Sequence, residues 1–412
     1  MSPSTQPIRR NATAPRPRGE IDLIAAIRTR AAQPGRALRL GIGDDCAILR
    51  PPPGHEIVVT TDLSLENVHF RRDWHPPESV GHRCLARGLS DLAAMGATPL
   101  AAFLSIALPR ELTAQDGRRK SGPGKSWPAD TWADTWIDRF LDGFLALAKA
   151  ANVPLAGGDT AQSPALQSPQ VKSVPSAGRT QAPSGLAIAD ILLIGAVKRG
   201  ASLLRSNARV GDVIYVTGAL GGAAAELLSL ERNPKKFAAL TKAAAGHPHL
   251  YPQPRIAAAQ ALSTRFKIRT GIDVSDGLST DLTHICEESG VAAELDAAAI
   301  PIHPLALQAQ KKDRATSAIG NSLSSVLDNG LAQPLNLALH DLADLALHGG
   351  EDYELLFTAP ARTRIPKQIA GVAIHPIGQI VTRTRYRPLI TLRTADGQTT
   401  PLQPHGWEHF RK

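Results

Sequence analysis

Apolar and polar residues alternate along this chain in a way that separates short strands from amphipathic helices. Apolar runs bounded by turn-forming residues predict strands at residues 38–49, 57–62, 101–108, 186–197 and 212–217. Apolar positions three and four residues apart predict helices at residues 21–32, 78–96, 136–151 and 281–287, and an alanine-rich helix that starts at Ala223. Because the strands and helices alternate without the strict repeat of a barrel, we expect a mixed α/β or α+β fold.

Three polar, low-complexity stretches interrupt this pattern at residues 111–130, 163–185 and 308–333, and we interpret them as solvated insertions. The chain of 412 residues is long enough for two domains of ordinary size. We place the boundary near residue 200, which gives an N-terminal domain at 20–199 and a C-terminal domain at 200–412.

The net charge of +9 is concentrated in part in residues 1–19, which carry four arginines and no acidic residue. We expect this segment to be a disordered basic tail, because its four prolines disfavour the amphipathic helix of a transit peptide. Aromatic residues make up only 4% of the chain and are not interleaved with basic ones, so the composition does not favour nucleic-acid binding.

Cys46, Cys84 and Cys286 are widely separated and show no CxxC spacing, which argues against a disulfide framework and a zinc site. No apolar run approaches the roughly 18 to 20 residues that a membrane span needs. We therefore expect a soluble protein of the reducing cytoplasm.

Carboxylates beside apolar runs or glycine turns are the candidate functional residues. They lie in the motifs Gly43-Asp44-Asp45, Thr60-Thr61-Asp62, Leu89-Ser90-Asp91, Gly157-Gly158-Asp159, Asp273-Val274-Ser275-Asp276 and Gly349-Gly350-Glu351-Asp352. A buried carboxylate must be paired, protonated or bound to a cation. Many such oxygens without a matching cationic cluster favour Mg²⁺ and a polyphosphate, so a magnesium–nucleotide site is the first hypothesis.

Asp91 illustrates the two interpretations that these motifs leave open. At helical spacing it shares an inward face with Cys84, where its charge needs a partner. That partner is either Arg87, one turn earlier, or a metal ion shared with Asp45 and Asp62.

The other motifs have structural alternatives too. Thr60-Thr61-Asp62 could be an ordinary strand exit, and Gly158-Asp159 a plain turn. Ser275 or Asp276 could cap a helix, and the same helix start could bind an anion or a metal. The P-loop-like segment at 122–126 lacks the required first glycine, because position 119 is arginine.

Taken in order, the segments GIGDDCAIL, TTDLSLENVHF, LSDLAAMGA, AGGDT, VIYVTG, DVSDGLSTDL, GGEDYELLF and GWEHF resemble the thiamine-monophosphate kinase family. Each motif is short, but the ordered set is specific and covers most of residues 20–412 outside the insertions. The resemblance implies the two-domain fold of aminoimidazole ribonucleotide synthetase-like ATP enzymes. Their N-terminal domain dimerises through its sheet, and their C-terminal domain is α/β, so a homodimer is implied.

The resemblance also implies roles for individual residues. The residues that it places around several Mg²⁺ ions are Asp45, Thr60, Thr61, Asp62, Asp91, Asp159, Asp273 and Asp276. Those that it places against ATP are Gly158, Asp159, Arg205 and Ser275. It places His69 against the thiamine phosphate, and Glu351 and Trp407 against the thiamine portion of this substrate. An aromatic face and a carboxylate suit a cationic thiazolium ring. No side chain is implied as a base or nucleophile.

The implied activity is in-line transfer of the γ-phosphoryl group of ATP to thiamine monophosphate, giving thiamine diphosphate. The alternatives are another ATP-using enzyme of the same superfamily, of the aminoimidazole ribonucleotide synthetase or selenophosphate synthetase type, or a nonenzymatic basic binding protein. The His69 and GWEHF segments favour the thiamine enzyme. The chain departs from the family at Gly88, where asparagine is usual, and the segment around Arg205 matches only loosely.

Overall fold

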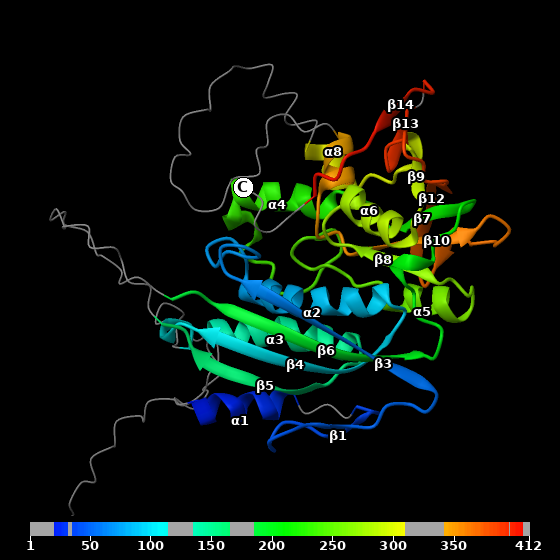
Figure 1. Cartoon of the computed structure of the whole chain (residues 1–412). Coiled ribbons are helices and arrows are strands. Elements are labelled where there is room, and N and C mark those ends of the chain that lie inside the picture. Colours follow the sequence, from blue (N-terminus) through cyan, green and yellow to red (C-terminus); the bar gives the residue numbers. More distant parts are fainter. Residues whose placement is uncertain are drawn as a thin grey trace, which may run out of the picture.

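The computed structural model describes residues 20–31, 35–113, 135–164, 185–309, 342–394 and 396–406. The basic tail, the P-loop-like segment, Trp407 and most of the three predicted insertions lie outside these ranges. Within them the chain forms two main sheets with helices packed between and around them (Figure 1).

The smaller sheet is built from the first half of the chain. Its elements and their neighbours are α1 (Glu20–Arg30), β1 (Leu38–Leu40), β2 (Ile48–Leu49), β3 (His55–Leu65), α2 (Pro77–Ala94), β4 (Thr98–Leu108), η1 (Arg110–Thr113), α3 (Trp136–Ala150), β5 (Leu155–Gln162) and β6 (Ile188–Lys198). The strand order is β3-β6-β4-β5, with β4 and β5 parallel and the other pairs antiparallel. β3 and β5 therefore lie at opposite edges.

The larger sheet comes from the second half. Its region contains η2 (Arg205–Asn207), β7 (Asp212–Thr217), α4 (Gly222–Arg232), η3 (Pro234–Phe237), α5 (Ile256–Thr264), β8 (Thr270–Val274), α6 (Leu278–Ser289), β9 (Ala292–Asp296), η4 (Ala297–Ala299), α8 (Leu342–His348), β10 (Glu354–Pro360), β11 (Gln368–Ile369), β12 (Val372–Val381), β13 (Ile390–Arg393) and β14 (Thr399–Pro401). The strand order is β14-β13-β9-β12-β7-β10-β8, and β11 pairs with β12.

Helix α2 lies between the two sheets and joins them (Figure 1). It packs on β3, β6 and α3 on one side and on α5, β8 and β10 on the other. Nearly all of its residues are buried, and these include the polar or charged Glu78, His82 and Arg83. This position makes α2 the element through which side chains of the first sheet can meet those of the second.

Two glycines allow α2 and α3 to cross closely. A Cβ atom on Gly81 would lie 1.9 Å from the Phe140 carbonyl oxygen, and one on Gly143 would lie 1.8 Å from the Glu78 carbonyl oxygen. Any side chain at these positions would push the helices apart, so the glycines set the distance between α2 and α3.

The mixed α/β fold expected from the sequence is confirmed, whereas one predicted strand and the turn alternative for Gly158-Asp159 were wrong. Residues 38–49 form two short strands instead of one, because the chain turns at Gly43, where φ is 126°. Gly157–Thr160 is not a turn but part of strand β5. Gly158 is needed because a Cβ there would lie 1.8 Å from the Leu104 carbonyl oxygen of β4. No helix within the described ranges is long and apolar enough to cross a membrane.

Candidate active site

Carboxylates from both halves of the chain meet around the C-terminal part of α2. Thr60 of β3 donates a hydrogen bond from Oγ1 to Oδ2 of Asp91 on α2. The next helix residue back, Ser90, donates from Oγ to Oδ2 of Asp273 on β8, at 2.6 Å. Asp91 belongs to the first half of the chain, and Asp273, which Ser90 binds, belongs to the second half. Helix α2 therefore brings carboxylates of both halves together.

Burial raises the pKa of each carboxyl group in this cluster. It is the main cause that raises the pKa of Asp62 to about 6 and that of Asp273 to about 7, and it also raises the pKa of Asp91. The negative charge of Asp91 raises the pKa of both neighbours further. Desolvated carboxylates that repel one another would each be stabilised by a nearby positive charge.

Arg87 is the nearest cation of the cluster. Its Nη2 lies 2.6 Å from Oδ1 of Asp62, and its Nη1 donates to the Leu63 carbonyl oxygen at 3.0 Å. Arg87 therefore makes its close ion pair with Asp62, and its positive charge also lowers the pKa of Asp91. Strand residues 60 and 62 lie on one face, and helix residues 91 and 87 lie one turn apart, so Thr60 faces Asp91 and Asp62 faces Arg87.

Strand alternation separates Thr61 from the cluster. Thr60 and Asp62 are half-buried toward α2, whereas Thr61 is exposed on the opposite face. Its hydroxyl does not join the other predicted magnesium ligands within one chain.

Gly88, where the family usually has asparagine, packs against the sheet. A Cβ atom there would lie 2.6 Å from Cδ1 of Leu193, so a side chain at this position requires the Leu193 side chain to move.

The Asp273–Asp276 motif forms a loop that a buried acid orients. Oδ2 of Asp281 accepts hydrogen bonds from the backbone N–H groups of Ser275 and Asp276, both at 3.1 Å. Gly277, not Ser275 or Asp276, is the N-cap of α6 and makes no side-chain cap bond, so the helix-cap alternative was wrong. The sequence pattern showed Asp281 only as a helical residue, because its side chain reaches Ser275 and Asp276 only after the loop folds back onto the helix.

Arg205 lies in η2 and is exposed. Its positive charge lowers the pKa of both Asp91 and Asp273, which places the guanidinium at the rim of the cluster. This position suits a contact with an anionic ligand of the cluster.

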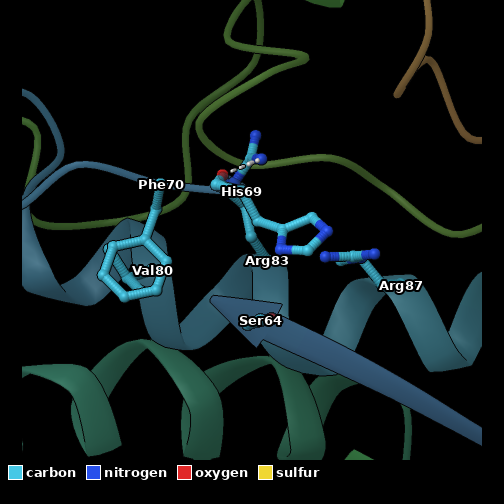
Figure 2. A pocket seen from close by; sticks show the side chains of 6 residues that line it. All are labelled: Ser64, His69, Phe70, Val80, Arg83 and Arg87. Carbon is cyan, nitrogen blue, oxygen red and sulfur yellow. Dashed lines mark hydrogen bonds between the residues drawn. The ribbon is translucent and has the colours of Figure 1, made fainter. Parts of the chain in front are cut away.

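A small pocket lies beside the cluster. Its lining residues are Ser64, His69, Phe70, Val80, Arg83 and Arg87 (Figure 2). Nδ1 of His69 accepts from the Leu65 N–H at 3.0 Å, and its carbonyl oxygen accepts from Nη2 of Arg83 at 3.0 Å. The close-up shows the His69 ring and the Arg87 guanidinium turned toward one another, so the pocket wall carries cationic and imidazole groups (Figure 2).

Glu351 stands next to this pocket, at a left-handed φ of 65°. Its Oε1 lies 2.8 Å from Nη2 of Arg83 and its Oε2 lies 3.0 Å from Nδ1 of His249. Burial acts to raise the pKa of Glu351, but the charge of Arg83 and the contact with His249 hold this pKa well below its usual value. The carboxylate therefore stays ionised.

The other acids of the same motif have structural roles. The Asp352 carboxylate accepts from the N–H groups of Gly221 at 2.6 Å and Ala223 at 3.1 Å, which caps α4. Glu354 is paired with Arg255 at 2.5 Å. Of the three acids, only Glu351 contacts a residue of the pocket wall, Arg83.

Asp45, Gly158 and Asp159 lie elsewhere. Asp159 is exposed on β5, three strand spacings from β3, which amounts to about 14 Å. The loop of Asp45 lies near the same edge, since a Cβ on Gly41 would be 3.7 Å from the Ala156 carbonyl oxygen of β5. A single pocket containing Asp45, Asp62, Asp91 and Asp159 does not form within one chain, because the strand order separates the two edges. Among the described residues, no three Asp, Glu, His or Cys side chains are close enough to hold a metal ion.

Comparison with known proteins assigns the chain. The family model described as AIR synthase related protein, N-terminal domain, matches residues 43–178, and its C-terminal counterpart matches residues 209–313. The thiamine-monophosphate kinase of Escherichia coli K12 is 31% identical over 396 residues, which cover 95% of this chain and 98% of that protein. The chain belongs to the thiamine-monophosphate kinase family. The Bacillus subtilis member of this family is 28% identical over 95% of this chain and 99% of its own length.

Solved structures of the thiamine-monophosphate kinase family share the fold. The enzyme from Stenotrophomonas maltophilia K279a superposes with a TM-score of 0.62 at 30% identity, covering 92% of this chain and 96% of that one. AaThiL complexed with AMPPCP and TMP gives a TM-score of 0.60 at 24% identity, covering 95% of this chain and 97% of that one.

Proposed function

We propose that this protein transfers the γ-phosphoryl group of ATP to thiamine monophosphate, giving thiamine diphosphate and ADP. The observation that carries this proposal is the junction at α2, where Asp91, Asp62 and Asp273 lie beside a pocket that Arg83 and Arg87 line, with Glu351 paired to Arg83. Membership in the thiamine-monophosphate kinase family supports it independently.

The charges of the pocket match those of the acceptor. Thiamine monophosphate has an anionic phosphate at one end and a cationic thiazolium ring in its middle. His69 and the guanidinium groups of Arg83 and Arg87 are suited to the phosphate. The ionised Glu351 is suited to the thiazolium, and Trp407, which lies outside the described residues, remains a proposed aromatic contact.

The chemistry needs no base from the protein. The second pKa of a phosphate monoester is near 6, so the acceptor is already an anion at neutral pH. One of its oxygens attacks the γ-phosphorus of ATP, the bond from that phosphorus to the β,γ-bridging oxygen breaks, and ADP leaves with the electron pair. The task of the site is to bring two polyanions into line.

We propose that Mg²⁺ serves this task. Thr60, Asp62, Asp91, Asp273 and Asp276 would supply the protein ligands, one or two carboxylates to each ion, and oxygens of the bound phosphates would complete the set. When bound, Mg²⁺ neutralises charge on both phosphate groups and orients them. We further propose that Arg205 and Ser275 contact ATP from the rim of the cluster and from the loop before α6.

We also propose a homodimer in which the second copy completes the site. The outer face of β3 exposes Ile57 at 45%, Val59 at 58% and Leu63 at 46%, an apolar strip that the described part of the chain leaves uncovered. Two such sheets packed face to face about a two-fold axis parallel to the strands would lay β5 of one copy opposite β3 of the other. Asp45, Gly158 and Asp159 would then approach the cluster of the second copy.

The domain boundary near residue 200 and a cytoplasmic location are proposed with the function. The strands of the small sheet end at Lys198, and those of the large sheet begin at Asp212. All three cysteines are free, and Cys84 and Cys286 are buried, which suits a reducing compartment.

The test is a product assay with the full chain, ATP, Mg²⁺ and thiamine monophosphate, analysed by chromatography. We expect thiamine diphosphate and ADP. A parallel incubation replaces thiamine monophosphate with an aminoimidazole precursor, and we expect no product there. Turnover of that precursor alone, or no turnover of thiamine monophosphate, would refute the proposal.

A further inference from the structure

Two buried histidines connect the Glu351 carboxylate to the segment that precedes α2. The side chain of His249 is 2% exposed, and His75 is also buried. Nε2 of His75 lies 3.0 Å from Nε2 of His249, and Nδ1 of His249 lies 3.0 Å from Oε2 of Glu351. The chain of contacts therefore crosses from one half of the molecule to the other and ends on the proposed thiazolium ligand.

The hydrogen-bond partners assign the protons along this chain. The Glu351 carboxylate can only accept, so the proton of the neutral His249 ring is on Nδ1 and is donated to Oε2 of Glu351. Nε2 of His249 then accepts from Nε2 of His75, and Nδ1 of His75 accepts from the Arg71 N–H at 3.1 Å, with the Arg71 carbonyl oxygen at the same distance. Arg83 Nη1 also lies 2.8 Å from Nδ1 of His249, and it donates to the His249 carbonyl oxygen at 2.6 Å.

The His249 ring is fixed from its backbone as well. Oε2 of Glu226 accepts from the N–H groups of His249 at 2.8 Å and Leu250 at 3.2 Å. Burial lowers the pKa of both histidines, which keeps the pair neutral, as one shared proton between two facing nitrogen atoms requires. The imidazole thus presents a directed donor to one carboxylate oxygen while Arg83 holds the other.

We propose that His249 is a positioning residue that orients the Glu351 carboxylate toward the thiazolium of the acceptor, with His75 fixing the tautomer of His249. This inference rests on the proposed function, because it takes Glu351 as the ligand of the thiamine portion. In this proposal His249 and His75 affect the affinity for thiamine monophosphate through Glu351, without contacting the substrate themselves.

Two variants at position 249 separate this role from packing. The amide nitrogen of asparagine is as many bonds from Cα as Nδ1 of histidine, whereas that of glutamine corresponds to Nε2. His249→Asn keeps the donor to Glu351, and we expect KM for thiamine monophosphate within about threefold of wild type. His249→Gln loses this donor, and we expect KM to rise about tenfold or more, with KM for ATP and kcat unchanged.

The matched control is His82→Gln. His82 is equally buried and bonds to the Pro252 carbonyl oxygen of the same loop at 2.7 Å, but it does not contact Glu351. We expect an unchanged KM for thiamine monophosphate in this variant. Thermal melting of each protein shows that the comparison is made between folded enzymes.

Equal KM increases in the asparagine and glutamine variants, or no increase in either, would overturn the inference while wild-type turnover left the proposed function intact. A wild-type enzyme without turnover would refute the proposed function and this inference with it. If the position 249 variants do not fold, His75→Asn and His75→Gln make the same comparison at the next residue of the hydrogen-bond chain. There, only asparagine should raise KM, since glutamine keeps a donor at the Nε2 position, and a reversed or absent difference would overturn the inference.

Discussion

Burial of the charged Asp91 side chain lowers the stability of the fold, and the proposed catalysis gives a reason for its presence. Its carboxylate is buried and lies near two other acids, and its hydrogen bond from Thr60 only partly offsets the desolvation. A residue kept at such a position is explained by a ligand that binds the charge.

Replacing Asp91 by asparagine tests this. The amide oxygen can still accept from Thr60, and the buried charge is gone, so we expect an unfolding midpoint equal to or above that of wild type. Turnover at saturating Mg²⁺ should fall about 100-fold or more. Steady-state kinetics and calorimetry measure both, with Asp296→Asn in the second half of the chain as the control. An unchanged rate would exclude Asp91 from the site.

Asp273 gives a prediction on pH. Its pKa is raised from 3.8 to about 7, mainly by burial and then by Asp91. Between these two values the folded protein binds a proton that the unfolded chain has lost, so stability decreases as the pH rises from about 4 to 7. Asp273→Asn removes this contribution. In EDTA, we expect its unfolding midpoint to exceed that of wild type by several degrees at pH 8 and to converge with it near pH 4. Parallel pH curves for the two proteins would contradict the assignment.

Several site residues were accessible from sequence because each stands in a short motif next to a strand end or glycine. The partners of those residues were not. The ion pair between Arg87 and Asp62, and the hydrogen bonds that Asp281 and His249 make, join residues that are adjacent only after folding. Their sequence neighbourhoods are those of ordinary helix and loop residues.

At the scale of elements, α2 determines the site, because it carries Ser90 and Asp91 and contacts both sheets. Its helical period made it predictable from sequence. The strand β5 was harder to predict, because Gly157 and Gly158 indicate a turn unless the close approach of β4 is known.

Gly143→Ala tests the close crossing of α2 and α3. The added methyl group would overlap the Glu78 carbonyl, so we expect a loss of about 1–3 kcal/mol in the free energy of unfolding. Denaturant titration measures it. The exposed Ala146→Ser on the same helix should change stability by less than about 0.5 kcal/mol. Equal small effects would show that the helices can separate freely.

At the scale of the whole molecule, the order of strands in the small sheet decides which acids meet. Sequence patterns predict strands but not their order, so the separation of Asp159 from Asp62 could not be predicted. In the proposed homodimer, a second copy would cover the exposed apolar face of β3 and restore the contact.

Val59→Lys tests the dimer. An ammonium group buried in an apolar interface is strongly unfavourable, so we expect the dimer dissociation constant to rise at least about tenfold, with a parallel loss of activity at low protein concentration. Analytical ultracentrifugation measures the first and the product assay the second. Thr400→Lys on exposed β14 is the control. A monomeric wild type with full activity would refute the shared site.

Phosphorus NMR of the full chain with ATP, Mg²⁺ and thiamine monophosphate tests the central claim most directly. We predict that the γ-phosphorus signal of ATP and the monophosphate signal disappear together, that thiamine diphosphate and ADP appear in equal amounts, and that EDTA stops the exchange. Release of inorganic phosphate from ATP while thiamine monophosphate stays intact would contradict the account.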